Sequence, residues 1–171
     1  MMTFSTWQQH ADYMLARGNL ANVMIVSSED GSIWASTDPD RFFLQEYQAT
    51  ITQEDGSEHS ETVNEAANLV KFMKGQSVGG QGLRVSGKKQ QVTRNFIDET
   101  HGIKVVYGKI PMGGCCIAHG GKCLVIGTFD EAKGHTSVEC NETITLMAMY
   151  VTRYLDWMSN LDWSFKLVSF P

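Results

Sequence analysis

The sequence predicts an α+β fold in which a central antiparallel sheet carries the N- and C-terminal helices on one face and short helices on the other. Two observations predict this fold. The middle of the chain is a series of short apolar strands with turn signals about every 8–12 residues, which is typical of antiparallel pairing. Apolar residues recur at helical spacing near both ends, and amphipathic helices bury their apolar sides by covering one face of a sheet.

The elements follow from capping residues, turn residues and apolar spacing. Ser5 or Thr6 is a suitable N-cap for the first helix, Asn64 is one for a later helix, and Gly18 is a suitable C-cap. Glycine-containing turns separate the strands. The expected elements are a helix over residues 5–17, strands over 21–26 and 33–36, a short helix over 42–47, an exposed acidic hairpin arm over 49–63, a helix over 64–74, strands over 83–85, 91–96, 103–110, 115–118 and 123–129, and a long helix over 139–158.

Composition narrows the function classes. The chain has 171 residues, of which 42% are hydrophobic and 19% charged, and its formal net charge is −5. These values fit one globular domain, expected over residues 1–158, and argue against a general nucleic-acid binder. No apolar run approaches the roughly 20 residues that a bilayer-spanning helix needs, and residues 1–7 lack a secretory pattern. We therefore expect a cytoplasmic protein.

The four cysteines are predicted to be buried free thiols. Cys115 and Cys116 are adjacent, so on a strand they would point to opposite faces and could not easily share a metal ion. His119, three residues after Cys116, suggests a thiol nucleophile as an alternative, but no orienting partner is evident. The sequence also lacks phosphate-loop and serine-hydrolase motifs. We expect no metal, no cofactor and no catalytic site.

Aromatic residues near both ends form the first candidate site. Trp7 lies on the first helix and Trp34 on the second strand, while Tyr150, Tyr154 and Trp157 share one side of the last helix. If both helices lie on the same face of the sheet, these rings would meet in a shallow groove. Extended proline-rich segments are already ordered, so they stack on such rings at little entropic cost. The alternative is that these aromatics are ordinary core residues.

A mixed basic and apolar surface forms the second candidate site. Lys89, Val92 and Arg94 lie in one strand region and Lys109 lies on the next strand. Arginine and lysine would give charge-assisted hydrogen bonds to an acidic partner, and Val92 would give an apolar contact. Taken alone, this surface also fits an ordinary solvated strand face.

Several segments, in this order, resemble the profilin family over residues 5 to about 157. They are T-W-Q-Q-H-A-D-Y-M-L (6–15), E-D-G-S-I-W-A-S (29–36), G-L-R-V-S-G-K-K-Q-Q-V-T-R (82–94), Y-G-K-I-P-M-G-G (107–114), K-C-L-V-I-G-T-F-D-E (122–131) and C-N (140–141). The arm with E-D-G, followed by T-V-N-E-A, most resembles profilins of apicomplexan parasites. Ser86 stands where a glycine is common in the family, and the usual glycine-tyrosine ending is missing.

The resemblance implies a cytoskeleton-associated non-enzyme that regulates actin polymerisation. Its expected partners are monomeric actin and proline-rich proteins such as formins. Phosphoinositides are a further candidate, because basic residues of this kind bind them in the family. The family often has tyrosine where His10 stands. The implied polyproline site is Trp7, His10, Trp34, Tyr150, Tyr154 and Trp157, and the implied actin site is Lys89, Val92, Arg94, Lys109, Asn141 and Glu142.

Two alternatives stay open at this point. A roadblock or longin-type scaffold without actin binding would have a similar α+β pattern, and it would dimerise through an edge strand or a helix.

Residues 159–171 form an expected C-terminal extension in which Trp163, Phe165 and Leu167 alternate like a strand. The extension either folds back over the aromatic groove or is a disordered tail.

Overall fold

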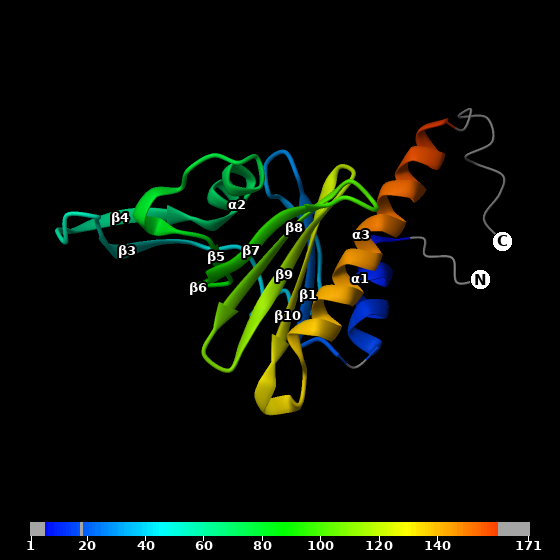
Figure 1. Cartoon of the computed structure of the whole chain (residues 1–171), viewed down its shortest axis with the longest axis horizontal. Helices are drawn as coiled ribbons and strands as arrows, with labels where there is room; N and C mark the ends of the chain where they lie inside the picture. Colours follow the sequence, from blue (N-terminus) through cyan, green and yellow to red (C-terminus); the bar gives the residue numbers. More distant parts are fainter. Residues whose placement is uncertain (1–5, 18, 161–171) are drawn as a thin grey trace.

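A six-stranded antiparallel sheet forms the centre of the molecule (Figure 1). The computed structural model describes residues 6–17 and 19–160, with side chains described as far as residue 154. All neighbouring strands pair in antiparallel fashion. In spatial order the strands are β2 (Ile33–Ser36), β1 (Asn22–Ser27), β10 (Cys123–Asp130), β9 (Gly113–Gly120), β8 (Ile103–Ile110) and β7 (Gln91–Asp98).

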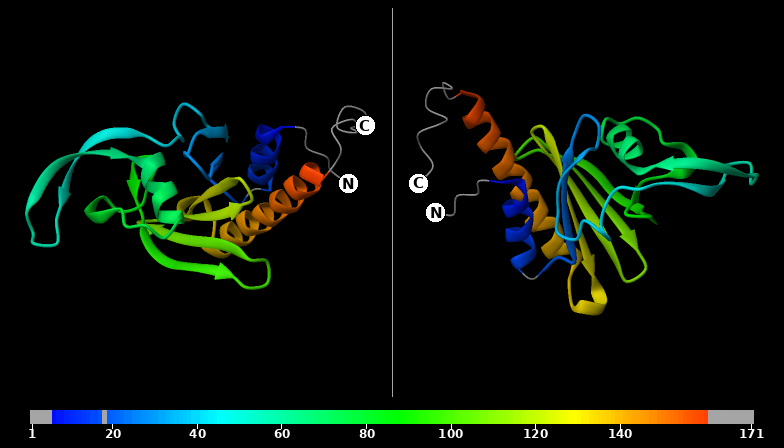
Figure 2. Two further views of the ribbon diagram at one scale, coloured as in Figure 1. Left: turned by 90° about the horizontal axis from the view of Figure 1, so that it is seen from above. Right: turned by 180° about the vertical axis from the view of Figure 1, so that it is seen from behind.

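The N- and C-terminal helices cover one face of this sheet, and a third helix covers the other (Figure 2). Helices α1 (Trp7–Ala16) and α3 (Ser137–Asn160) pack on strand residues such as Val23 in one buried core. Helix α2 (Glu65–Met73) contributes Leu69 to a second core on the opposite face. Alternate strand residues feed the two cores, so the central strands are apolar on both sides. The predicted α+β architecture is confirmed.

Helix α1 begins at a capping box. The side chain of Thr6 accepts a hydrogen bond from the backbone N–H of Gln9 at 3.2 Å, and the Gln9 side chain accepts one from the Thr6 N–H at 3.2 Å. Two otherwise unpaired backbone donors are thereby satisfied. Of the two predicted N-caps, Thr6 is therefore the one used. The predicted C-cap, Gly18, lies outside the described residues.

Helix α3 lies unusually close to the sheet, because glycines stand beneath it. A Cβ atom on Gly127 of β10 would collide with the side chain of Ile144, and one on Gly120 of β9 would lie 3.0 Å from the backbone oxygen of Ala148. Any larger residue at Gly127 would therefore push the helix away from the strands. This close packing fixes the height of the helix above the sheet.

The predicted arm is a separate two-stranded hairpin that projects from the body of the molecule (Figure 1). Its strands are β3 (Glu46–Thr52) and β4 (Glu58–Asn64), which pair in regular antiparallel register. Most of its side chains are exposed, whereas Ile51 and Val63 are buried. Asn64 ends the hairpin and caps α2, since its side chain accepts a hydrogen bond from the Ala67 N–H at 2.9 Å.

A buried carboxylate holds the root of the arm. Glu65, which has no exposed surface, accepts hydrogen bonds from the Gln45 N–H at 2.8 Å, the Tyr47 hydroxyl at 3.2 Å and the Gly87 N–H at 2.6 Å. A buried carboxylate is tolerated only when its oxygens have such partners. Glu65 therefore joins the start of α2 to the first strand of the arm and to the loop at Gly87.

That loop is the turn of a short hairpin formed by β5 (Arg84–Val85) and β6 (Lys88–Lys89). Its two central residues, Ser86 and Gly87, have φ angles of 51° and 82°. A two-residue turn with positive φ at both positions matches the twist of a hairpin, and glycine adopts it without strain. Ser86 adopts it as well, and its hydroxyl donates a hydrogen bond to the Arg41 carbonyl at 3.0 Å. The turn geometry is thus kept without a glycine at that position.

The predicted short helix over residues 42–47 is wrong. A turn replaces it, in which the Asp38 carbonyl accepts hydrogen bonds from the Arg41 and Phe42 N–H groups, and β3 begins at Glu46. The reason lies in the spacing of the apolar side chains. Phe42 and Leu44 both pack on the second core, and residues two apart share a side only in extended chain.

The C-terminal elements extend beyond their predicted limits. Helix α3 runs from Ser137 to Asn160, so the expected domain limit at residue 158 falls inside the helix. Short 3₁₀ turns, η1 (Gly79–Gln81) and η2 (Glu131–Lys133), precede β5 and α3. The predicted strand-like segment with Trp163, Phe165 and Leu167 lies outside the described residues. Within the described chain, no helix has the length and apolarity that crossing a membrane requires.

Candidate functional site

Five aromatic rings from three elements form a continuous row. Trp34 on β2 lies 5.0 Å from Trp7 on α1, measured between ring centroids, and Trp7 lies 5.5 Å from His10. His10 in turn lies 5.9 Å from Tyr150 and 6.4 Å from Tyr154 on α3. The two tyrosines are stacked, with 6.1 Å between centroids and 13° between planes. We call these five residues the aromatic row.

The row exists because α1 packs against the edge strand β2 and also lies beside α3 (Figure 2). Trp7 and His10 are one helical turn apart on α1, and Tyr150 and Tyr154 are one turn apart on α3. Trp34 is 36% exposed and Tyr150 is 38% exposed, so both ends of the row remain open to solvent. The row therefore offers accessible ring faces, although Trp7 also packs against the buried core.

His10 is the buried member of the row, and its protonation state follows from its contacts. Its Nδ1 lies 2.7 Å from the carbonyl oxygen of Thr6, so Nδ1 carries the proton and donates. Burial lowers the pKa of the imidazole, and the hydrogen bond to the Thr6 carbonyl offsets this only in part. At neutral pH His10 is therefore a neutral ring between Trp7 and the two tyrosines.

The structure brings together the predicted aromatic residues Trp7, His10, Trp34, Tyr150 and Tyr154. The sixth, Trp157, lies on α3, but its side chain falls outside the described residues. Tyr13 was not among the predicted site residues. It lies one helical turn beyond His10 on α1, and this spacing in the sequence could have indicated it. The role of these residues in binding remains a prediction.

The residues of the second candidate site come from four elements. Lys89 of β6 and Lys109 of β8 line one shallow depression beside Pro111. The Lys89 ammonium donates a hydrogen bond to the Gly80 carbonyl at 3.2 Å, while the Lys109 ammonium lies 3.2 Å from a carboxylate oxygen of Glu131. Both lysines are exposed and stay accessible to a partner.

Arg94 of β7 has a different setting. Its guanidinium lies 4.5 Å from the centroid of the Phe96 ring and 5.8 Å from that of Tyr107, which are cation–π contacts. Val92, on the same edge strand, is 37% exposed. The two aromatic partners of Arg94 were not predicted, because Tyr107 reaches it only through the pairing of β7 with β8.

Asn141 and Glu142 lie in the first turns of α3, after Cys140 has entered the core. Glu142 is exposed. The Oδ1 atom of Asn141 is buried and accepts no hydrogen bond from any described residue. The burial of Cys140 therefore fixes where α3 starts, and this in turn sets the positions of Asn141 and Glu142.

The cysteines behave as buried strand residues. Cys115 packs in the core beneath α2 and Cys116 in the core beneath α3, so the two adjacent thiols point to opposite faces as predicted. Burial raises the pKa of Cys115 to about 12 and that of Cys116 well above the usual thiol value. His119 is exposed and pairs with Leu124, whose side chain belongs to the core opposite Cys116. The described thiols therefore lack nucleophilic character at neutral pH.

The fold is that of a small α+β domain with an aromatic row along one side. A family model described as Profilin matches residues 5–154. A profilin of Tetrahymena pyriformis is 32% identical over 132 residues, which cover 75% of this chain and 80% of that protein. Profilin-1 of Dictyostelium discoideum is 24% identical over 127 residues, which cover 74% of this chain and 81% of that protein. The chain belongs to the profilin family.

Solved structures agree on the fold. Profilin II of Acanthamoeba castellanii has a TM-score of 0.63 at 17% identity, covering 87% of this chain and 98% of that one. Mouse profilin IIa, solved in complex with a double repeat from the FH1 domain of mDia1, has a TM-score of 0.58 at 18% identity, covering 86% and 97%. These similarities establish the fold alone.

Proposed function

We propose that this protein binds monomeric actin through its basic strand surface and proline-rich segments through the aromatic row, and so regulates actin polymerisation. The observation that carries the proposal is the row itself, with Trp7 and Trp34 5.0 Å apart and open ring faces at both ends. Proline rings stack on such faces, and a proline-rich segment loses little entropy because it is already extended. Membership of the profilin family supports both activities.

One structural neighbour supports a proline-rich ligand of the kind found in formins. Mouse profilin IIa was solved with FH1 repeats of mDia1, and this chain has the same fold. We therefore propose proline-rich repeats of formin type as ligands, and a cytoplasmic protein that associates with the actin cytoskeleton. Phosphoinositide binding stays a prediction from the family.

The finer resemblance to apicomplexan profilins rests on the arm. The hairpin β3–β4 projects from the body of the molecule between β2 and α2, and it carries acidic residues such as Glu54 and Asp55 at its tip. We propose that this arm places the chain among profilins with an inserted hairpin.

Two measurements test the proposal with the full chain. Titration with an oligoproline of ten residues should change the tryptophan fluorescence, because Trp7 and Trp34 would be covered. Micromolar protein should suppress the spontaneous nucleation of pyrene-labelled actin. If the protein leaves both signals unchanged and instead forms a dimer at the same concentration, the roadblock or longin-type scaffold is the better account.

A further inference from the structure

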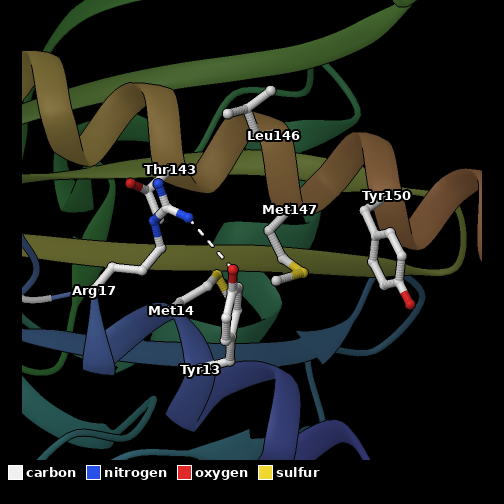
Figure 3. Close-up of a pocket in the computed structure, with 7 residues that line it drawn as sticks. All are labelled: Tyr13, Met14, Arg17, Thr143, Leu146, Met147 and Tyr150. Carbon is white, nitrogen blue, oxygen red and sulfur yellow. Dashed lines mark hydrogen bonds between the residues drawn. The ribbon is translucent and has the colours of Figure 1, made fainter. Parts of the chain in front are cut away.

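The aromatic row continues into a cleft between α1 and α3 (Figure 3). Tyr150 belongs to both, since its ring lies near His10 on one side and lines the cleft on the other. The cleft has a volume of about 280 Å³. Its apolar and aromatic lining consists of Tyr13, Met14, Leu146, Met147 and Tyr150.

One charged group stands at the far end of the cleft. Among the described residues that line it, Arg17 is the only charged one, and Thr143 is its polar neighbour. The Arg17 guanidinium donates a hydrogen bond to the Tyr13 hydroxyl at 3.4 Å, and Figure 3 shows it lying beside Thr143. Arg17 is exposed and stands at the C-cap of α1. An exposed guanidinium offers five N–H donors in a planar fork, which is well suited to a carboxylate.

The spacing of these features sets the length of a ligand. Arg17 follows Trp7 by ten residues, which corresponds to about 15 Å along a helix axis. An extended proline-rich chain rises about 3.1 Å per residue, so roughly five residues span that distance. A segment that stacks its prolines on Trp7 and on the exposed ring of Tyr150 would bring its next residues over Met147 and Leu146, and then to Arg17.

We propose that this cleft is an extension of the proline-binding site, which takes an aliphatic residue followed by an acidic residue at one end of a proline-rich segment. The apolar lining accepts the aliphatic side chain, and Arg17 pairs with the carboxylate. The cleft thus selects among proline-rich ligands by what flanks the prolines. This inference rests on the proposed binding of proline-rich segments.

The experiment compares capped peptides on the full-length protein by tryptophan fluorescence or calorimetry. The probes are six prolines followed by leucine and glutamate, the same peptide with glutamine in place of glutamate, and both sequences in reverse order. For one of the two chain directions, we expect the glutamate peptide to bind about threefold to fivefold more tightly than the glutamine peptide at low salt. The difference should shrink at high salt, because the ion pair is exposed.

Two variants locate the effect. Arg17→Gln should abolish the preference for glutamate while leaving the affinity for plain oligoproline unchanged. Arg41→Gln serves as the matched control, because Arg41 is an exposed arginine that lines a different depression beside Lys88. With a further peptide in which alanine replaces the leucine, Leu146→Ser should remove the gain from leucine over alanine. Val138→Ser, which changes another exposed apolar residue of α3, should not.

The outcomes separate this inference from the proposed function. If oligoproline binds but the glutamate and glutamine peptides bind equally in both directions, the cleft is not a subsite and the aromatic row still binds proline. A preference for glutamate that survives Arg17→Gln also overturns the inference. If plain oligoproline fails to bind, the proposed binding of proline-rich ligands is wrong, and the inference fails with it.

Discussion

The two candidate surfaces of this molecule are built in different ways. The aromatic row is assembled from rings that already touch one another, so a ligand meets a surface that needs little rearrangement. The basic surface consists of side chains that are engaged elsewhere: Lys109 with Glu131, Lys89 with a backbone carbonyl, and Arg94 with two rings. A partner must replace these contacts. We therefore expect packing to dominate binding at the row, and screened charge at the basic surface.

The largest expected effect tests whether the row depends on its outermost ring. Trp34→Ala should weaken oligoproline binding by about 30-fold, since removing a large aromatic side chain that a ligand covers commonly costs about 2 kcal/mol of binding free energy. The measurement is a fluorescence or calorimetric titration, with actin nucleation assayed in parallel and expected to be unchanged. Ile33→Ala is the control, because Ile33 is a neighbouring exposed residue of the same strand. Equal losses in both variants would contradict a specific role for the indole.

A second change tests what the two surfaces share, which is the packing of α3 on the sheet. Gly127→Ala should lower the free energy of unfolding by about 1–3 kcal/mol, because the new methyl group collides with Ile144. Denaturant unfolding measures this. Ile144→Val removes part of the collision, so the double variant should lose less stability than the sum of the two single variants. Oligoproline affinity and actin affinity should both fall, since α3 carries Tyr150 and Tyr154 of the aromatic row as well as Asn141 and Glu142 of the predicted actin site. Strict additivity would show that the collision is not the cause.

The third prediction concerns Arg94, whose guanidinium lies over the rings of Phe96 and Tyr107. Arg94→Gln should weaken actin binding by about fivefold to tenfold, in line with the loss of one charge-assisted contact. Arg94→Lys should recover only part of this, because an ammonium keeps the charge and loses the planar stacking on Phe96 and Tyr107. Lys122→Gln, at an exposed turn, is the control. An effect of Arg94→Gln on oligoproline affinity would show that the surfaces are not independent.

The smallest expected effect comes from His10. Its pKa is lowered by burial, so below the unfolded value of 6.5 the unfolded chain binds more protons than the folded one. The free energy of unfolding should therefore fall as the pH drops from 6.5 towards the lower pKa of the folded state. His10→Tyr should remove this part of the pH dependence, measured as unfolding midpoints at about pH 7.5 and about pH 5. An unchanged pH dependence in the variant would assign the effect to other histidines.

The sequence was most informative where spacing alone decides the geometry. Trp7 and His10, or Tyr150 and Tyr154, fall on one side of a helix by their numbers, and the family resemblance indicated that the two helices meet. The order and limits of the strands were predicted closely for the same reason, because turns and alternation are local properties. The clearest failure was the stretch before the arm, where Phe42 and Leu44 fit two periodicities and a core contact decided between them. The two-residue strand β6 (Lys88–Lys89) was also not predicted, because it is too short to show alternation.

What the sequence did not reveal depends on contacts between distant segments. Glu65 appears as an ordinary acidic residue at the start of a helix, and nothing local indicates that Gly87 donates to it from 22 positions away. The stacking of Arg94 on Tyr107 requires the register of two strands, including the irregularity between Val92 and Arg94. The cleft that ends at Arg17 is lined by residues of both α1 and α3, and only the packing of these distant helices brings its two walls together.

The buried Glu65 has a practical consequence for experiments on this protein. The hydrogen bonds of Glu65 hold the root of the arm, whereas a Cβ atom added at the tip, on Gly56, would meet no neighbour within 4 Å. A fluorescent label or a short epitope inserted at this point would stand clear of the aromatic row, since α1 and α3 lie at the other end of the molecule (Figure 1). Attachment through the tip would also orient the molecule uniformly on a sensor chip.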